Sequence, residues 1–189
     1  RRELGDRQGE GVTLNNMAAI YDDLGKYEQA LEQYQQSLSI QQEIGDREVE
    51  GATLNNIVEL YRVQGKYDQV LSYYEQALPI RRDAGDKIGE GATLNNIAII
   101  YRTQRKSAKA LEYFTQALVI AREFGDRDGE AQSGKNLGFA YYDIGDLAKA
   151  EEYIARAVQI AEQIDLPLLE EWREGLAHVR AARQGTEEA

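Results

Sequence analysis

The sequence lacks several residue types on which whole classes of protein depend. Its 189 residues include no cysteine and one histidine. The absence of cysteine excludes disulfides, thiolate metal sites and cysteine nucleophiles, and a single histidine excludes a multi-histidine metal cluster. No segment approaches the roughly 18 apolar residues of a membrane span, and no charged-then-apolar leader is present. We therefore expect a cytoplasmic protein that has no cofactor and no membrane partner.

Positive charge is also scarce in this chain. It carries 22 Lys and Arg against 33 Asp and Glu, which gives a net charge of -11 at pH 7. A surface with this balance repels a phosphate backbone, and no local basic patch offsets the repulsion. Nucleic acid is therefore not expected among the partners.

What the sequence does contain is an internal repeat. The tetrapeptide TLNN occurs at residues 13–16, 53–56 and 93–96, and SGKN stands at 133–136, 40 residues further on. Residues 46–85 and 86–125 align without a gap and are identical at 21 of 40 positions. Repetition at this length is typical of a solenoid.

Each repeat is predicted to contain two helices. In the first unit, Leu14, Met17 and Tyr21 recur at helical spacing, and a second apolar stripe begins after Gly25. Gly-Asp pairs at 45–46, 85–86 and 125–126 combine a residue that tolerates a left-handed conformation with a side chain that caps helices. These pairs predict the turns between units, which gives repeat units at residues 6–45, 46–85, 86–125 and 126–165.

Small and aromatic residues recur at fixed positions of these units. A small residue and a tyrosine in the first helix are followed by Gly-x-Tyr-x-x-Ala and by an aromatic residue and an alanine in the second. This pattern, clearest in NLGFAYYDIGDLAKAEEYIARAV at 136–158, resembles the tetratricopeptide repeat. The 40-residue unit is similar to those of kinesin light chains, of the LGN and Pins adaptors, and of bacterial arrays that carry CHAT protease-like or NTPase domains.

This resemblance implies an all-α fold, a right-handed superhelical solenoid of antiparallel helix pairs. We expect about four units and a C-terminal capping helix at residues 166–184. Residues 1–5 resemble the tail of a preceding repeat helix, and residues 185–189 are expected to form a disordered tail.

Two substitutions within the repeat are expected to disturb local structure. Arg105 and Ser107 replace the glycine and the tyrosine or leucine of the other hairpin turns, so this turn should be looser. Pro79 lies inside a second helix, where the missing N–H and the bulky ring should bend or split the helix.

The candidate binding site is a series of asparagines, Asn16, Asn56, Asn96 and Asn136, which we call the asparagine ladder. The resemblance implies that first helices line a concave groove and that this position holds the backbone of an extended peptide. An amide suits the task because it both donates and accepts hydrogen bonds. The preceding position holds Asn15, Asn55, Asn95 and Lys135.

Other groove positions would have to select the ligand. The residues expected there include Asp23, Glu59, Arg62, Arg102, Phe139 and Tyr142. Arg62, Arg102 and Lys135 are cations that suit a carboxylate, so we hypothesise a ligand with a basic segment near the first unit and an acidic or C-terminal group near units three and four. The alternative is that the asparagines only form hydrogen bonds between adjacent repeats or to a neighbouring carbonyl, within the wall of the groove.

Two functions are compatible with these sequence patterns. The first is a protein-protein interaction module that binds an extended peptide or partner segment, such as another domain of a parent protein. The second is a structural or oligomerisation spacer, with self-association through exposed array ends. No constellation of nucleophile, base and oxyanion donor is visible in the sequence, so we do not expect an enzyme.

Overall fold

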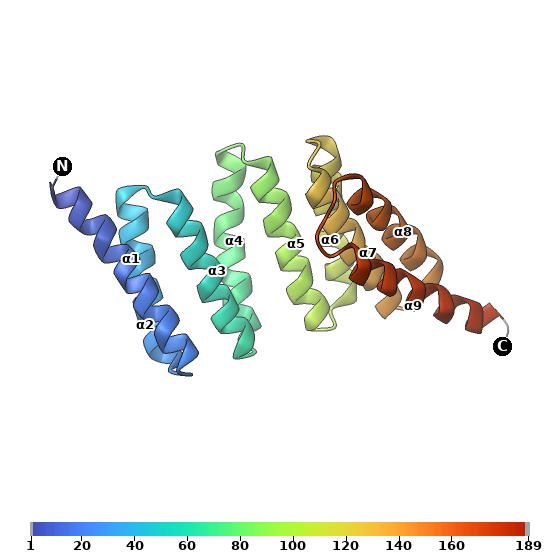
Figure 1. Cartoon of the computed structure of the whole chain (residues 1–189), viewed down its shortest axis with the longest axis horizontal. Coiled ribbons are helices and arrows are strands. Elements are labelled where there is room, and N and C mark those ends of the chain that lie inside the picture. Colours follow the sequence, from blue (N-terminus) through green and yellow to red (C-terminus); the bar gives the residue numbers. More distant parts are fainter. Residues whose placement is uncertain (1, 188–189) are drawn as a thin grey trace. The chain divides into compact units, whose positions relative to one another are not determined.

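The computed structural model describes residues 2–187, with side chains for residues 7–46 and 49–186. Helices make up almost all of this part of the chain, and no strand occurs in it. Within residues 2–63, and again within residues 87–163, Figure 1 shows consecutive helices running in opposite directions. The helices are α1 (Arg2–Asp23), α2 (Tyr27–Ile44), α3 (Arg47–Val63), α4 (Tyr67–Asp83), α5 (Lys87–Thr103), α6 (Ser107–Glu123), α7 (Arg127–Asp143), α8 (Leu147–Gln163) and α9 (Leu169–Glu187).

The chain divides into two compact units, Arg1–Tyr73 and Tyr74–Ala189. Within the first unit, α2 packs against both α1 and α3, and α1 also contacts α3. Within the second unit, each helix from α5 to α9 packs against the next, and α5 also contacts α7. Both units are therefore built from stacked helix pairs, as the all-α prediction required.

The predicted repeat units each contain one helix pair, from α1–α2 to α7–α8. The helix α9 lies in the segment expected to form the cap and continues to Glu187, because Ala181, Arg183 and Gln184 are good helix formers. The expected tail is thus helical as far as it is described, and residues 188–189 lie outside the described residues. Likewise α1 includes residues 2–5, and Arg1 lies outside.

Left-handed residues end the helices. Gly45, Gly85 and Gly125 have φ of 74°, 68° and 71°. The carboxylates of Asp46, Asp86 and Asp126 then accept hydrogen bonds from the backbone N–H groups of Val49, Gly89 and Gly129. The predicted Gly-Asp turns are therefore confirmed, since one residue ends a helix and the next caps the following one.

The turn at Arg105 keeps the geometry of its glycine counterparts. Arg105 has φ of 58°, and its N–H donates to the carbonyl of Arg102 at 2.9 Å. The N–H of Lys106 donates to the carbonyl of Tyr101 at 2.9 Å, as that of Lys66 does to Tyr61. The expected loosening is therefore wrong, because both backbone bonds form and hold the backbone of Arg105 in a left-handed conformation that costs about 1–2 kcal/mol.

Pro79 does not split its helix either, since α4 is continuous from Tyr67 to Asp83. The residue lies in the last turns of the helix, where its side chain is exposed. The N–H that it lacks removes a single bond from the helical series, and the remaining bonds keep the helix intact.

Small residues allow the paired helices to approach closely. Ala18 and Ala30 are fully buried in the first unit, and Ala98 and Ala110 in the second. At Gly138 of α7 the space for a Cβ is already filled, because an added methyl would lie 2.5 Å from Cγ1 of Ile154. This position therefore requires glycine for the contact between α7 and α8.

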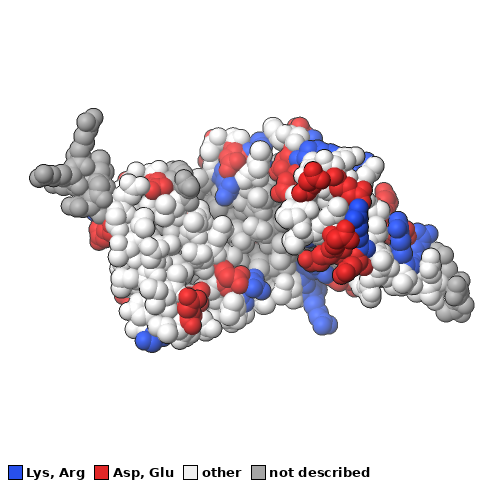
Figure 2. Space-filling model, viewed as in Figure 1, with Lys and Arg blue, Asp and Glu red and all other residues white. Residues whose placement is uncertain are grey.

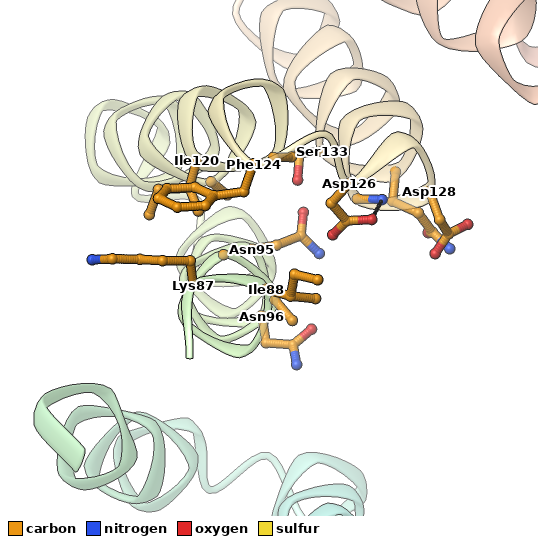
Figure 3. Close-up of a pocket in the computed structure, with 15 residues that line it drawn as sticks. Lys87, Ile88, Asn95, Asn96, Ile120, Phe124, Asp126, Asp128 and Ser133 are labelled. Atoms are coloured by element: carbon orange, nitrogen blue, oxygen red, sulfur yellow. Dashed lines mark hydrogen bonds between the residues drawn. The ribbon is translucent and has the colours of Figure 1, made fainter. Parts of the chain in front are cut away.

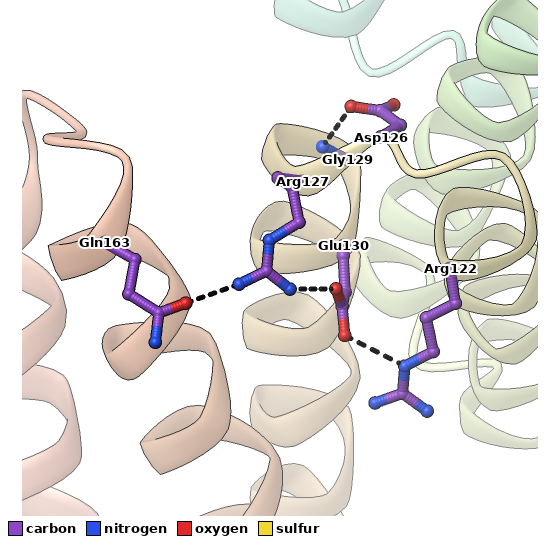
Figure 4. A network of polar contacts seen from close by, with 6 residues as sticks. All are labelled: Arg122, Asp126, Arg127, Gly129, Glu130 and Gln163. Carbon is purple, nitrogen blue, oxygen red and sulfur yellow. Dashed lines mark hydrogen bonds and ion pairs between the residues drawn. The ribbon is translucent and has the colours of Figure 1, made fainter.

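A buried glutamate links successive helix pairs (Figure 4). Glu130 of α7 is 6% exposed, and its carboxylate accepts hydrogen bonds from Arg122 of α6 at 3.1 Å and from Arg127 at 2.8 Å. Arg127 also donates to the side-chain oxygen of Gln163 in α8. Three consecutive helices are thereby joined through two side chains.

The same junction recurs one repeat earlier. Glu90 accepts from Arg82 at 2.7 Å and from Lys87 at 2.9 Å. These partners lower the pKa of the Glu90 carboxyl, because both hydrogen bonds favour its charged form. In the first unit, Gln42 donates to Glu50 across the same sequence separation of eight residues. The side-chain contact to this glutamate, at positions 50, 90 and 130, is therefore a recurring feature of the repeat.

The helix α9 is fixed to α8 by an apolar core and by ion pairs at its edge. Trp172, Leu176 and Val179 are buried in one cluster with Ile154 and Val158. Arg173 pairs with Glu162, and Arg180 and Arg183 both pair with Glu151. Figure 2 shows acidic and basic atoms side by side over this end of the chain. None of the described helices has the length and apolar content that crossing a membrane requires.

Candidate groove site

In the first unit, the predicted asparagines differ in their surroundings. Asn15 accepts a hydrogen bond from the hydroxyl of Thr53 at 3.1 Å, which joins α1 to α3. Asn16 and Asn55 are exposed and Asn56 is half-buried. Among the described residues, the side chains of Asn16 and Asn56 have no hydrogen-bond partner. Their amides are therefore open to an external ligand, whereas that of Asn15 is used in packing.

In the second unit, two of the predicted asparagines bond to one another. The side-chain amide of Asn136 in α7 donates to the side-chain oxygen of Asn95 in α5 at 3.2 Å. This contact is of the kind that the structural alternative anticipates, a bond between adjacent repeats. Asn96 is half-buried and its amide has no partner among the described residues. It remains the open amide of this unit.

The charged groove residues of the first unit lie together at the ends of α1 and α3. Arg62 holds Glu59 through two hydrogen bonds of 2.7 and 2.6 Å, which lower the pKa of the Glu59 carboxyl. The pKa of Asp22 is raised, first by burial and then by repulsion from Asp23 and Glu59. Arg62 is thus neutralised by Glu59, and the surface around it is acidic.

The basic groove residues of the second unit also have internal partners. Arg102 pairs with Asp143 at 2.5 Å, and its guanidinium lies 5.6 Å from the ring centre of Phe139. The ammonium of Lys135 lies 4.2 Å from the ring centre of Trp172 in α9. Burial lowers the pKa of Lys135, because the charged form is less solvated there than in water. The cations expected to meet a ligand carboxylate are therefore all engaged within the fold.

The helix α9 covers much of this face of α7. An added Cβ at Gly175 would lie 2.9 Å from the ring of Phe139, so backbone and ring are in close contact. The hydroxyl of Tyr142 shares a hydrogen bond of 2.9 Å with Nε2 of His178. Lys135, Phe139 and Tyr142 thus contact the terminal helix, a role that sequence reasoning did not assign to them or to His178.

A cavity of about 340 Å³ lies between α5, the end of α6 and the start of α7 (Figure 3). Ile88, Ile120 and Phe124 supply apolar side chains, and Ile88 and Phe124 are 59% and 49% exposed. Asn95 and Asn96 line the same cavity. The hollow therefore brings two predicted groove asparagines beside an open apolar surface.

Polar groups complete this cavity. Ser133 is 3% exposed, and its hydroxyl has no hydrogen-bond partner among the described residues. In Figure 3 its oxygen points into the space above Asn95. Asp126 and Asp128 lie on one side, and Lys87 extends away from them on the other. Because Lys87 is paired with Glu90, the described walls of the cavity keep unpaired carboxylate oxygens but no unpaired cation.

Sequence reasoning missed Ile88, Phe124 and Ser133, although the repeat contains a signal for two of them. Position 88 is isoleucine where the matching positions hold Gln8, Glu48 and Asp128. Position 133 is serine where Thr13, Thr53 and Thr93 stand in the other units. Thr93 bonds back to the carbonyl of Gly89, whereas Ser133 makes no such bond. Departures from the repeat thus mark the cavity better than the retained asparagines do.

Comparison with known families gives one match that spans most of the chain. A family model described as tetratricopeptide repeat matches residues 9–83, 49–123 and 89–163. The resemblance inferred from the sequence pattern is thereby confirmed. No curated protein sequence gives a significant match.

Solved structures support the same fold. A Rap protein complexed with competence and sporulation factor is 20% identical, with a TM-score of 0.73 over 95% of this chain and 51% of that chain. A STAND protein with a tetratricopeptide repeat sensor, from Pyrococcus horikoshii, is 27% identical, with a TM-score of 0.66 over 83% of this chain and 24% of that one.

A third similar structure is a putative kinesin light chain with nearly identical TPR-like repeats, from Podosopora anserina. It is 19% identical, with a TM-score of 0.67 over 93% of this chain and 88% of that chain. The present chain spans less than two thirds of the length of the Rap and STAND chains. At these identities the Rap and kinesin light chain matches establish likeness of fold alone.

Proposed function

The chain belongs to the tetratricopeptide repeat family, and we propose that it is a protein-interaction module that binds an extended peptide or partner segment along its first helices. The observation that carries this proposal is the cavity between α5, α6 and α7. Ligand sites are concave and mostly apolar, with a few polar groups that fix orientation. This cavity combines exposed Ile88 and Phe124 with the open amide of Asn96.

Structural relatives add support at the level of the fold. The similar Rap structure is of a protein complexed with competence and sporulation factor, and the similar STAND protein is described as carrying a tetratricopeptide repeat sensor. Repeats stacked in this way present extended surfaces, which suits recognition of a partner segment. A binding role without catalysis is the function we transfer to this chain.

The test is selection from a displayed library of random dodecapeptides on the immobilised chain. Selected peptides should be displaced by the soluble chain, and Asn96→Ala should weaken their binding about two- to tenfold, the effect of one neutral hydrogen bond. Gln159→Ala is the matched control, because Gln159 is exposed on the second helix α8. Circular dichroism should show equal helicity for both variants.

A library that yields no competed peptide would argue against the module. Peptides that bind Asn96→Ala and Gln159→Ala equally would show that the asparagine takes no part in binding. The structural alternative would then lead, because the bond between Asn136 and Asn95 already gives two of these residues a role in repeat packing.

A further inference from the structure

We propose that the cavity between α5, α6 and α7 selects a peptide in which a large apolar residue is followed by lysine or arginine. This inference rests on the proposed function and specifies its ligand. It also reverses the charge that the sequence predicts for this part of the chain, namely an acidic or C-terminal ligand group. The reversal follows from which charged side chains are already paired within the fold.

The apolar part of the ligand is assigned to the surface formed by Ile88, Ile120 and Phe124. Ile88 projects from the first turn of α5, and Phe124 is the C-cap residue of α6. Figure 3 shows the Phe124 ring and Ile120 on one side of the hollow and Ile88 across from them. A ligand side chain of leucine, isoleucine or phenylalanine size would remove these exposed surfaces from water. A cavity of about 340 Å³ is large enough for such a side chain and part of the adjoining backbone.

The basic part of the ligand is assigned to the carboxylates of Asp126 and Asp128. One oxygen of Asp126 accepts from the N–H of Gly129, and the other accepts no hydrogen bond from the described residues. Asp128 is exposed and likewise unpaired in the described part of the chain. The nearby cation Lys87 bonds to Glu90, which it shares with Arg82. At Asp126 and Asp128, a ligand lysine or arginine would therefore meet carboxylate oxygens that pair with no cation in the described part of the chain.

The backbone of the ligand is assigned to the polar groups between these two regions. Ser133 is 3% exposed, and its hydroxyl lines the cavity without a hydrogen-bond partner in the described part of the chain. A ligand backbone group that enters the cavity can therefore form a hydrogen bond with this hydroxyl, which both donates and accepts. The amide of Asn96 can donate and accept, which matches a peptide unit.

The combination occurs once among the four repeats of the sequence. Ile88 corresponds to the polar residues Gln8, Glu48 and Asp128, whereas Phe124 corresponds to Ile44, Ala84 and Ile164. The apolar residue at position 88, beside the large side chain at position 124, therefore distinguishes this unit from the other three. A ligand that depends on this pair would bind in a single register along the repeat array.

The test uses the full chain labelled with ¹⁵N and three capped peptides at millimolar concentration. The first probe is acetyl-Gly-Ala-Leu-Arg-Ala-Gly-amide, and the others replace its leucine by serine or its arginine by glutamate. We expect the first probe to shift the amide signals of Gly129, Ser133 and Asn96, and each altered probe to bind at least about fivefold more weakly.

Two variants locate the interaction on the protein. Ile88→Gln introduces the residue found at position 8, and Asp128→Asn removes one carboxylate without changing the size of the side chain. Each should weaken binding of the Leu-Arg probe about fivefold, and the charge variant should reduce the preference for arginine over glutamate, since Asp126 keeps its charge. Glu123→Gln is the control, because Glu123 is exposed and does not line the cavity.

Equal binding of the arginine and glutamate probes, or shifts confined to the first unit, would overturn this inference and leave the proposed function standing. Binding unaffected by both Ile88→Gln and Asp128→Asn would overturn it in the same way. If neither these probes nor any library peptide binds, the proposed function and the inference on its ligand fail together.

Discussion

At the scale of single residues, buried charge at the repeat junctions is the feature with measurable consequences. Glu90 is 5% exposed, but Arg82 and Lys87, which hold it, keep much of their surface in water. Solvent therefore screens part of each ion pair, and the contribution of this contact to stability is modest. Its dependence on pH nevertheless has a definite sign.

We expect Glu90→Gln to lower the free energy of unfolding by about 1 kcal/mol at pH 7 and by much less at pH 3. The folded state depresses the pKa of Glu90, so its stabilising effect is present above the unfolded pKa and is lost as pH falls through the folded pKa. Urea denaturation at the two pH values measures the difference. Glu123→Gln, an exposed substitution, is the control. For Glu90→Gln, an equal loss at both pH values would contradict the role assigned to the Glu90 charge.

The residue scale also shows what the sequence could predict. The Gly-Asp turns were predictable, because few residues other than glycine adopt positive φ readily and aspartate is a strong N-cap. The partners of Arg62, Arg102 and Lys135 were not. Each cation lies where a peptide carboxylate was expected, but it already has a partner within the fold. The partners are Glu59 for Arg62, Asp143 for Arg102 and the ring of Trp172 for Lys135. Which of two neighbouring groups a long side chain meets depends on rotamers and helix offsets that a one-dimensional pattern does not specify.

At the scale of helices, the close contact between α7 and α8 has a single-residue determinant. Gly138 faces Ile154 and the carbonyl of Ala150, with room for a hydrogen only. Gly134 lies one turn earlier on the same helix, and an added Cβ there would have ordinary contacts of 3.7 Å or more. The two glycines therefore form a natural matched pair.

We expect Gly138→Ala to destabilise the protein by about 1–3 kcal/mol, because the methyl group forces the helices apart. Gly134→Ala should be neutral or stabilising by up to about 1 kcal/mol, because alanine favours the helix and fits the space. Thermal unfolding monitored by circular dichroism compares the two. Equal effects would show that helix propensity, and not the distance between α7 and α8, governs this face.

Helix positions were predictable to a large extent from the 40-residue period and the two apolar stripes in each unit. The contacts of α9 were harder to predict from the sequence. Trp172 and Val179 mark an amphipathic helix, but the pattern does not reveal that Gly175 and His178 lie against Phe139 and Tyr142 of α7. Long-range packing of this kind decides which predicted groove residues remain open. The cavity was missed for the same reason, since its walls come from three different helices.

At the scale of the molecule, contacts between neighbouring helices dominate each unit. Among the described helices, α1, α2 and α3 pack with one another in the first unit, and each helix from α5 to α9 packs against the next in the second. The stability of such a chain is approximately the sum of the contributions of each repeat and of the contacts between neighbouring repeats. A destabilising substitution should therefore affect mainly the helices that pack against the substituted residue.

We expect Ile154→Ala to speed amide hydrogen exchange in α7, α8 and α9 while leaving α1, α2 and α3 unchanged. Ile154 is fully buried in the core shared by α8 and α9, and its truncation should cost about 2–5 kcal/mol locally. Hydrogen exchange with mass spectrometry resolves the segments. The same acceleration in α1–α3 would instead indicate a single cooperative unit, and Gln159→Ala serves as the exposed control on α8.

The glutamate junction between helix pairs has a further consequence for the gene. Arg82 reaches Glu90 and Arg122 reaches Glu130 across the same eight residues, with a Gly-Asp turn between them. If a recombination event removed residues 87–126, Asp86 would be followed by Arg127, and Arg82 would stand eight residues before the glutamate now numbered 130. Loss or duplication of one 40-residue block would thus restore the same Arg–Glu contact at the new junction between helix pairs. The number of repeats can therefore change in evolution while each interface between neighbouring repeats stays the same.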